Sequence, residues 1–367
     1  MMKKRYGVLS LLLAFVLLLG ACGSATEPQK SEEPKASEEQ GEASGSEMTG
    51  DKKPIVALLC DPAGTQVFVL DTIRGLEDAA KKYGFEARIV ECEDSAAYED
   101  QARALLQEGV SFILGGAWQA GEAISTVAKE FPDAATYAII DTEVAQENVK
   151  SIYYHEQEGA YLIGQIAALV TQPDEKIFGS VHVNEGPGSW KWRWGYMEGV
   201  KSIKPDATFI FNYVGGYSEP AKAKEFALQQ YEQGARFINA AAAGGDSGVF
   251  EAAKEKGFYT SGQDVDLTSP DNPYVLTCQL KDSHQTVLNV MDEYFGGKEW
   301  TSDNETLGLK EGGVGAVHIT HESKNPPQAP LTQEIIDQVK ETAEKIKSGE
   351  LNLRNMPTEE EFNAANK

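Results

Sequence analysis

The amino-acid sequence predicts an α/β protein made of two doubly wound lobes. Short apolar runs rich in β-branched residues alternate with segments whose apolar residues recur every three and four positions. This alternation is typical of βαβ units in a parallel sheet that is covered on both faces. The pattern occurs twice in succession over about 300 residues, a length that suits two domains of ordinary size. Ligands of such sheets bind at the carboxyl ends of the strands, so two lobes predict a cleft between them.

The first series begins at residue 54. Its strands are predicted at residues 54–60, 86–92, 110–116 and 135–141, with helices at 68–84, 97–109 and 120–131. Gly84 and Gly109 stand where two of the helical patterns end, a position that favours a left-handed glycine.

The second series follows the segment 147–172. Its strands are predicted at 176–183, 208–215, 235–243 and 258–264, with helices beginning near Trp190, Glu219 and Ser247. Further elements come after it: a strand at 274–280, a helix at 283–297, a short strand near 313–319 and an amphipathic helix at 332–346. We therefore expect the chain to cross between the lobes more than once.

These crossings divide the folded part of the chain between the lobes. The expected limits are 54–145 with 266–300 for the N-terminal lobe, 146–265 with 301–350 for the C-terminal lobe, and 351–367 for a tail.

The first 53 residues are predicted to lie outside the fold. Residues 1–22 have a basic start, an apolar stretch too short for a membrane span, and the sequence Leu19-Gly20-Ala21-Cys22. This pattern predicts a bacterial lipoprotein signal peptide that is cut at a lipid-modified Cys22; an ordinary secretory signal with an incidental cysteine is the alternative. Residues 23–53 are rich in Ser, Glu, Lys, Pro and Gly, which predicts a flexible acidic tether.

Charge and cysteine content narrow the function classes. The formal net charge is -24 at pH 7, which argues against binding to nucleic acid or anionic lipid surfaces and is explained largely by solubility. Cys60, Cys92 and Cys278 are widely spaced within apolar runs, so they are predicted to be buried free thiols rather than a disulfide framework or metal site.

No motif for catalysis, metal binding or a nucleotide phosphate is found. The five histidines form no HExxH, and the chain contains no GxSxG. His318 and His321 form HxxH, but residues three apart in a strand point to opposite faces. Two glycine-rich turns at 184–190 and 240–248 lack the phosphate-binding spacing, and Lys191 is wrongly placed to supply it. No cofactor or metal is predicted.

Aromatic and acidic residues gather at the predicted carboxyl ends of strands. Phe68, Trp118 and Tyr217 each follow a strand, and Trp190, Trp192 and Trp194 crowd one turn, so a flat ligand could be held between rings. Asp141 and Asp264 end strands of the two series, where carboxylates could accept hydrogen bonds from vicinal hydroxyls. Packing residues, helix caps and solvated loop residues are the alternatives, and Asp266 is expected to be loop polarity.

Seven stretches of sequence resemble one family in the family's own order. They are YAIID, EGAYLIGQIAALVT, YVGGYSEPAKAKEFA, AAGGDSGVFEAAKEKG, GQDVD, VLTCQLK and GLKEGGVG. The chain from Pro54 to Ile346 resembles the basic membrane protein family, substrate-binding lipoproteins of ATP-binding-cassette (ABC) importers that include purine nucleoside receptors. The resemblance implies a type I periplasmic-binding-protein fold.

The resemblance also implies roles for single residues. Phe68 matches the purine-stacking phenylalanine, Asp141 and Asp264 match the aspartates of the ribose site, and Lys281 matches the lysine of the family's LTSxxK phrase. Family aromatics match Trp118, Trp192 and Tyr217. Three positions depart from the family: Val69 replaces an asparagine, Ile73 a tryptophan and Cys278 a serine. The departures leave the purine selectivity open, and whether Lys281 contacts ligand or braces a hinge stays open as well.

The expected function is therefore capture of a nucleoside outside the membrane by a monomeric, lipid-anchored receptor, which passes it to an ABC permease. A purine base is favoured. The alternatives are a receptor for another flat aromatic or hydroxylated ligand, a sensory ligand-binding protein, and an exported nucleoside or sugar hydrolase using Asp141 and Asp264. Because no nucleophile accompanies these two carboxylates, the protein is not expected to be an enzyme.

Overall fold

A computed structural model describes residues 53–297 and 299–365. The predicted signal peptide, the lipidation site Cys22 and all but the last residue of the predicted tether lie outside the described residues. Within the described ranges, no helix has both the length and the apolar character that a membrane span requires.

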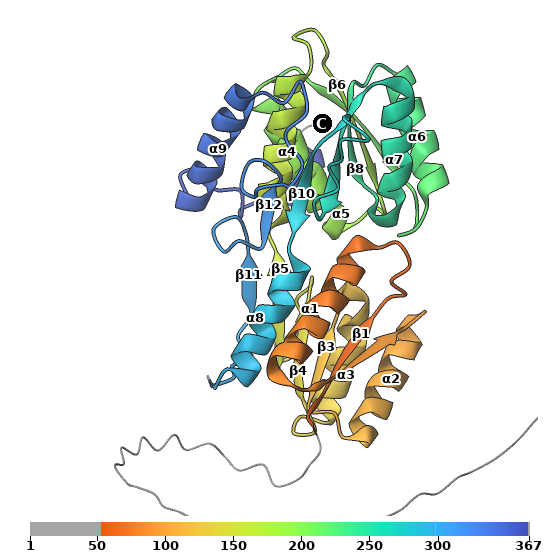
Figure 1. The fold of residues 1–367 in the computed structure, drawn as a ribbon, viewed down its shortest axis with the longest axis vertical. Helices are drawn as coiled ribbons and strands as arrows, with labels where there is room; N and C mark the ends of the chain where they lie inside the picture. Colours follow the sequence, from red (N-terminus) through yellow and green to blue (C-terminus); the bar gives the residue numbers. More distant parts are fainter. Residues whose placement is uncertain (1–52, 298, 366–367) are drawn as a thin grey trace, which may run out of the picture. The chain divides into compact units, whose positions relative to one another are not determined.

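The first sheet has six strands in the order β11-β5-β4-β3-β1-β2, and every neighbouring pair is parallel (Figure 1). The strands are β1 (Ile55–Cys60), β2 (Glu86–Glu91), β3 (Phe112–Gly115), β4 (Thr136–Ile140), β5 (Val149–Tyr154) and β11 (Glu305–Leu307). One face is covered by α1 (Val67–Tyr83) and α8 (Ser283–Phe295), and the other by α2 (Ser95–Glu108) and α3 (Gly121–Glu130). We call this sheet with its helices the first lobe.

Strand β1 shows why the sequence builds a sheet covered on both faces. Val56 and Leu58 belong to the hydrophobic core under α1 and α8, whereas Ala57 and Leu59 belong to the core under α2 and α3. All four side chains are fully buried. A strand buried on both faces reads as a continuous apolar run, which is the pattern that residues 54–60 display.

The second sheet also has six strands, in the order β12-β10-β9-β8-β6-β7, and only β12 runs antiparallel to its neighbour. The strands are β6 (Ile177–His182), β7 (Thr208–Tyr213), β8 (Phe237–Ala241), β9 (Tyr259–Asp264), β10 (Val275–Lys281) and β12 (Val314–Ala316). We call this sheet with its helices the second lobe.

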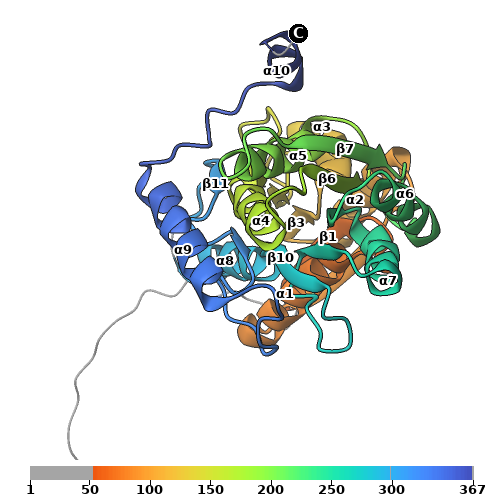
Figure 2. The same ribbon diagram turned by 90° about the horizontal axis from the view of Figure 1, so that it is seen from above.

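Five helices cover the second sheet, and Figure 2 shows them on its two sides. One face packs against α4 (Glu156–Val170) and α5 (Pro187–Lys201), with α9 (Gln333–Ser348) packed on α4, and the other face packs against α6 (Pro220–Glu232) and α7 (Asp246–Lys256). Both sheets therefore have the same strand order, so β1 to β5 of the first lobe correspond to β6 to β10 of the second.

The observed sheets correct the expected lobe limits at three strands. β5 and β11 lie in the first sheet, although they were expected in the C-terminal lobe, and β10 lies in the second sheet, although it was expected in the N-terminal lobe. β5 was missed because its Lys150 is polar yet only 2 % exposed; its Nζ pairs with Glu293 (2.8 Å) and Glu305 (2.6 Å). β10 was misassigned because it pairs parallel with β9 without a helix between them, which is unusual for parallel strands.

The described chain crosses between the lobes three times: between β5 and α4, between β10 and α8, and between β11 and β12. These crossings are hydrogen-bonded to one another. The His155 N–H donates to the Leu307 carbonyl (3.0 Å), and the Asp282 N–H donates to the Gly313 carbonyl (3.0 Å). The Leu309 N–H donates to Oε2 of Glu158 at the start of α4 (2.7 Å). These bonds gather the crossings into one hinge.

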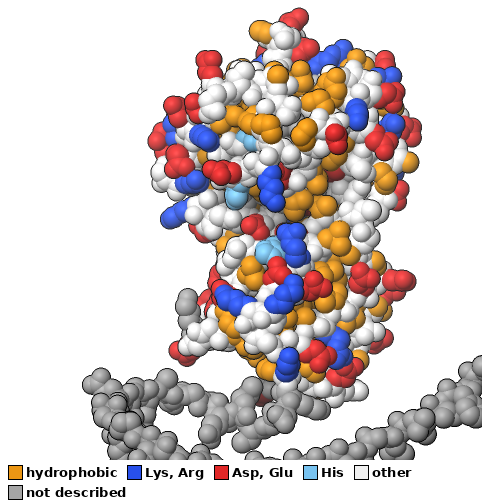
Figure 3. Space-filling model, in the orientation of Figure 1, with side chains coloured by type: hydrophobic (Ala, Val, Ile, Leu, Met, Phe, Trp, Pro, Cys, Tyr) orange, Lys and Arg blue, Asp and Glu red, His pale blue; other side chains and the backbone are white. Residues whose placement is uncertain are grey.

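The segment after α9 packs against the second lobe. Arg193 of α5 forms a bidentate ion pair with Glu359 at the start of α10 (Glu359–Ala365), and the Trp190 indole N–H donates to the Pro357 carbonyl (2.7 Å). Leu353 is buried in the core. Figure 3 shows acidic and basic side chains interspersed on one face of both lobes, as is usual for a solvent-exposed surface.

Cys60, Cys92 and Cys278 are buried free thiols, as predicted. Burial raises the pKa of Cys278 to about 12, so this thiol stays protonated at neutral pH.

The close packing of α4 on α5 makes one stability prediction. A Cβ atom at Gly199 would overlap the Tyr161 carbonyl of α4, whereas a Cβ atom at Gly188, near the start of the same helix, would meet no atom within 4 Å. Because the backbones must move apart, Gly199→Ala should lower the free energy of unfolding by about 1–3 kcal/mol. Urea unfolding measures the loss, and Gly188→Ala is the matched control with little change; equal midpoints for the two variants would contradict the prediction.

Candidate functional site

A cavity of about 570 Å³ lies between the lobes at the carboxyl ends of the parallel strands. Residues from both lobes line it, which is the position expected for the ligand site of two facing α/β sheets. The seven residues predicted from the sequence to bind ligand all line this cavity: Phe68, Trp118, Asp141, Trp192, Tyr217, Asp264 and Lys281.

Asp141 and Asp264 occupy equivalent places in the two lobes. Asp141 follows β4 directly and Asp264 is the last residue of β9, and these strands hold the same position in their sheets. Both residues have left-handed backbone conformations, with φ of 67° and 68°. Such conformations are strained for residues other than glycine and are found preferentially at functional sites.

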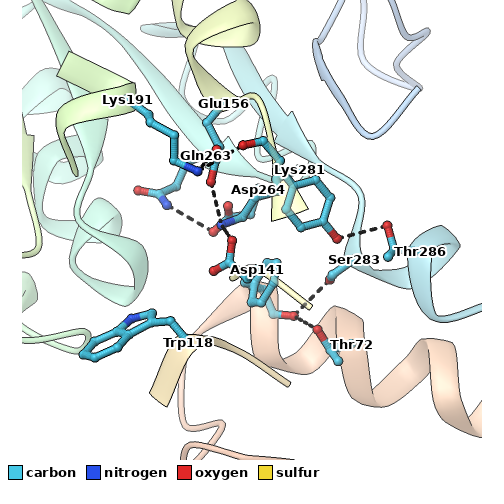
Figure 4. Close-up of polar contacts among 12 residues, drawn as sticks. Thr72, Trp118, Asp141, Glu156, Lys191, Gln263, Asp264, Lys281, Ser283 and Thr286 are labelled. Carbon is cyan, nitrogen blue, oxygen red and sulfur yellow. Dashed lines mark hydrogen bonds and ion pairs between the residues drawn. The ribbon is translucent and has the colours of Figure 1, made fainter. Parts of the chain in front are cut away.

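Lys281, the last residue of β10, joins the lobes through its ammonium group (Figure 4). Its Nζ lies 2.9 Å from Oδ1 of Asp141 in the first lobe and 3.8 Å from Oε1 of Glu156, the first residue of α4. Lys191 of α5 extends this chain of charges, because its Nζ lies 2.5 Å from Oε2 of Glu156. Four charges of alternating sign therefore run from the first lobe, through the hinge, into the second lobe.

Aromatic rings surround the same ammonium. The Nζ of Lys281 lies 4.4 Å from the centre of the Phe68 ring, 5.7 Å from that of Tyr154 and 5.9 Å from that of Trp192. Burial lowers the pKa of Lys281, but the carboxylates of Asp141, Asp264 and Glu156 raise it by a larger amount. The net shift of the pKa is upward, so the lysine stays charged. This geometry makes Lys281 a brace between the lobes; its contact with a ligand remains a prediction.

Phe68 is held in place by the hinge as well. Its carbonyl accepts hydrogen bonds from the hydroxyls of Thr72 (2.8 Å) and of Ser283 at the start of α8 (3.1 Å) (Figure 4). The Tyr154 hydroxyl donates to Thr286 one turn further along α8 (3.0 Å). The side of the cavity that contains Phe68 is thus hydrogen-bonded to α8, the helix that follows β10.

Asp264 presents an acceptor without a partner. The residue is 4 % exposed; its Oδ2 accepts from Nε2 of Gln263 (3.1 Å), and its Oδ1 has no hydrogen-bond partner among the described residues. Burial raises the pKa of Asp264 to about 6, against the opposing effect of Lys281. Burial also raises the pKa of Asp141, although Lys281 lies beside it. A donor from a ligand would satisfy the free oxygen of Asp264.

The predicted aromatic residues differ in how far they are enclosed. Phe68 and Trp192 are buried, whereas Trp118 is 55 % exposed. The indole N–H of Trp118 in the first lobe donates to the Tyr217 hydroxyl in the second (2.9 Å), so this pair spans the cleft. Of the three tryptophans near one turn, only Trp192 lines the cavity, because Trp190 bonds to Pro357 and Trp194 packs into the core.

Several cavity residues were not predicted from the sequence: Asp61, Gln66, Gln119, Glu156, His182, Lys191 and Gln263. A partial signal for Glu156 exists, since it is one of two acidic residues, with Glu158, in the first turn of a helix whose later residues are mostly apolar. Gln263 directly precedes Asp264, yet glutamine alone carries no such signal. Burial lowers the pKa of His182 to about 3, so this imidazole is neutral, and it bonds to the Ser180 hydroxyl (2.7 Å).

In the described part of the chain, no group of three or more His, Cys, Asp or Glu side chains is arranged to hold a metal ion. His318 and His321 meet through their backbones instead, where the His318 N–H donates to the His321 carbonyl (2.8 Å).

Comparison with known proteins identifies the family. The profile of the Bmp family, described as "ABC transporter substrate-binding protein PnrA-like", matches residues 55–355. Basic membrane protein A of Borreliella afzelii is 31% identical, over 69% of this chain and 78% of its own length. The "ABC transporter nucleoside-binding protein BmpA" of Lactococcus lactis subsp. cremoris is 28% identical, over 60% of this chain and 67% of its own length.

Solved structures share the fold at lower identity. An ABC transporter solute-binding protein from Aeropyrum pernix superposes with a TM-score of 0.73 at 23% identity, covering 85% of this chain and 96% of its own. A sugar transporter from Clostridium phytofermentans superposes with a TM-score of 0.56 at 12% identity, and the match covers 72% of this chain and 98% of the transporter chain. These similarities confirm the type I periplasmic-binding-protein fold.

The family match decides between the broad classes of function. Proteins of this family bind a solute for an ABC transporter and are not enzymes, so the alternative of an exported hydrolase is set aside. With the family profile covering nearly the whole described chain, this protein belongs to the Bmp family of ABC transporter substrate-binding proteins.

Proposed function

We propose that this protein captures a nucleoside outside the membrane, with a purine base favoured, and delivers it to an ABC permease. The observation that carries the proposal is the cavity between the lobes, where aromatic rings and carboxylates from both lobes meet. Its volume of about 570 Å³ falls within the range of small-molecule sites.

The carboxylates support a ligand that carries hydroxyl groups. Oδ1 of Asp264 is buried without a partner in the described part of the chain, and a buried acceptor is stabilised when a ligand donates to it. Oδ1 of Asp141 accepts a hydrogen bond from Lys281, and a carboxylate can accept several hydrogen bonds through its two oxygens. A vicinal diol such as that of ribose offers two donors at the spacing that a carboxylate accepts.

The rings support a flat ligand part. Phe68 comes from the first lobe and Trp192 from the second, and both are buried at the cavity wall. Stacking against an aromatic face contributes about 1–3 kcal/mol per base. The Lactococcus relative, by its name, binds nucleosides.

Val69 in the cavity wall leaves room for flat ligands other than purines. Val69 lines the cavity at the position where the resemblance implies an asparagine, so an amide that could bond to a base edge is replaced by an apolar side chain. A site without that amide discriminates less between hydrogen-bonding patterns of the base.

A ligand between the lobes would couple binding to closure of the two lobes. Contacts that form with both lobes favour the closed arrangement over an open one, and the three crossings provide the hinge. The sequence around Cys22 supports a lipid anchor that keeps the receptor beside its permease.

Isothermal titration calorimetry tests the proposal. The chain from residue 23, freed of bound ligand by unfolding and refolding, is titrated with guanosine, inosine, adenosine, cytidine and riboflavin. The proposal predicts saturable 1:1 binding of at least one purine nucleoside. Absence of heat with every nucleoside would contradict it, and binding of riboflavin alone would favour another flat ligand.

Two neighbouring aspartates provide a matched pair of variants. Asp264→Ala should weaken nucleoside binding about 5- to 150-fold, because a buried ligand hydroxyl would lose its acceptor at a cost of about 1–3 kcal/mol. Asp266→Ala should leave affinity unchanged, since Asp266 caps a turn by accepting from the Thr268 N–H (3.0 Å) and does not line the cavity. Equal affinities of the two variants would remove Asp264 from the site.

Binding should also depend on pH through Asp264. Because burial raises its pKa to about 6, this carboxyl takes up a proton as the pH falls below 6. A ligand hydroxyl donates to the ionised form, so binding at low pH must release that proton. We expect the dissociation constant to rise about tenfold from pH 7 to pH 5, and Asp264→Asn to abolish this rise. The same rise in the variant would assign the titration to another group.

A further inference from the structure

Strands β8 and β9 separate where they reach the cavity. Their ladder pairs Phe237 with Tyr259, Ile238 with Thr260 and Asn239 with Ser261, and goes no further within the described strands. Beyond that point β8 continues to pair with β6, and β9 with β10. In the first lobe the corresponding strands β3 and β4 stay paired to Gly115, the last residue of β3. The separation is therefore particular to the second lobe.

Two side chains take over the backbone donors at this separation. The Ala242 N–H donates to Oδ1 of Asp246 (2.7 Å), and the Ala243 N–H donates to Oε1 of Gln263 (3.2 Å). Gln263 in turn donates through Nε2 to Oδ2 of Asp264 (3.1 Å). A continuous path of contacts thus leads from Asp246, through the turn at Ala243 and the Gln263 amide, to Asp264.

The Gln263 amide is oriented by this path. With Oε1 occupied by the Ala243 N–H, its Nε2 faces Asp264. Ala243 has a left-handed backbone with φ of 54°, which is strained for alanine and needs support from its surroundings. Asp246 supplies that support through the preceding residue, Ala242. Gln263, Ala243 and Asp264 all line the cavity.

Asp246 itself differs from an ordinary acidic residue at the start of a helix. It is the first residue of α7, yet it is 2 % exposed, and its Oδ2 has no hydrogen-bond partner among the described residues. Burial, together with the nearby Asp264, raises its pKa above the ordinary value. The first lobe also has a short 3-10 turn that leads into a helix, and there the corresponding first residue is Gly121. A buried acid is thus not required for this connection.

We propose that Asp246 is a positioning residue for the ligand: it holds the Ala242–Ala243 turn so that the Gln263 amide binds Oδ2 of Asp264 and leaves Oδ1 for a ligand donor. This inference rests on the proposed function in one respect, that Asp264 contacts the ligand. It assigns Asp246 a task in binding that a role in starting α7 would not include.

Binding measurements separate the two roles. Asp246→Ala should weaken affinity for guanosine or inosine about tenfold, and Asp246→Asn, which keeps the Oδ1 acceptor, should restore it to within about twofold of the unmodified protein. Gln263→Ala should cause a similar loss, and the double variant should lose no more than the larger single loss, because both changes break the same path. Glu122→Ala, which removes an exposed acid from the first turn of α3, is the control and should leave affinity unchanged.

Two results of the binding measurements would overturn the inference: unchanged affinity of Asp246→Ala, or losses that add in the double variant. Crystal structures of the protein and of Asp246→Ala test the positioning without any ligand, and the variant should lose the bond between Gln263 and Asp264. If that bond persists, the inference fails. If the bond is lost but the unmodified protein binds no nucleoside, the positioning holds and the proposed function fails.

Discussion

Lys281 carries a full positive charge at the place where the crossings between the lobes meet, and its side chain is only 9% exposed. A charge so buried needs carboxylates nearby, and removal of a partner from such a pair costs about 3–5 kcal/mol. Asp141 at the end of β4 and Glu156 at the start of α4 meet this need. The hinge and the ligand cavity are therefore one electrostatic unit.

The same unit restricts the ligand. Lys281 and Lys191 supply two ammonium groups to the cavity, whereas six carboxylates line it: those of Asp61, Asp141, Glu143, Glu156, Glu185 and Asp264. With all of them ionised, the charges leave an excess of four negative charges. A neutral ligand with hydroxyl donors suits this arrangement better than an anion, because an anion would add to the excess of negative charge. The electrostatics thus favour a nucleoside over a nucleotide.

Much of this architecture could be predicted because it follows from periodic patterns. Continuous apolar runs such as residues 54–60 identify central parallel strands, and residues at the strand ends, such as Asp141 and Asp264, then had to meet at one edge. What could not be predicted depends on long-range contacts. Strand β5 could not be predicted because it contains the polar Lys150, whose burial depends on ion pairs with Glu293 and Glu305, far along the chain. Glu156 and Gln263 likewise gain their places only through partners that the folded chain brings to them.

A crystal structure of the protein grown with guanosine tests the central claim most directly. We expect one nucleoside between the lobes, with a ribose hydroxyl within hydrogen-bond distance of Oδ1 of Asp264 and the base in contact with Phe68 and Trp192. The ion pair between Lys281 and Asp141 should be retained. A nucleoside bound outside the cavity, or one whose ribose lies away from Asp264, would contradict the proposed role of Asp264 in ligand binding.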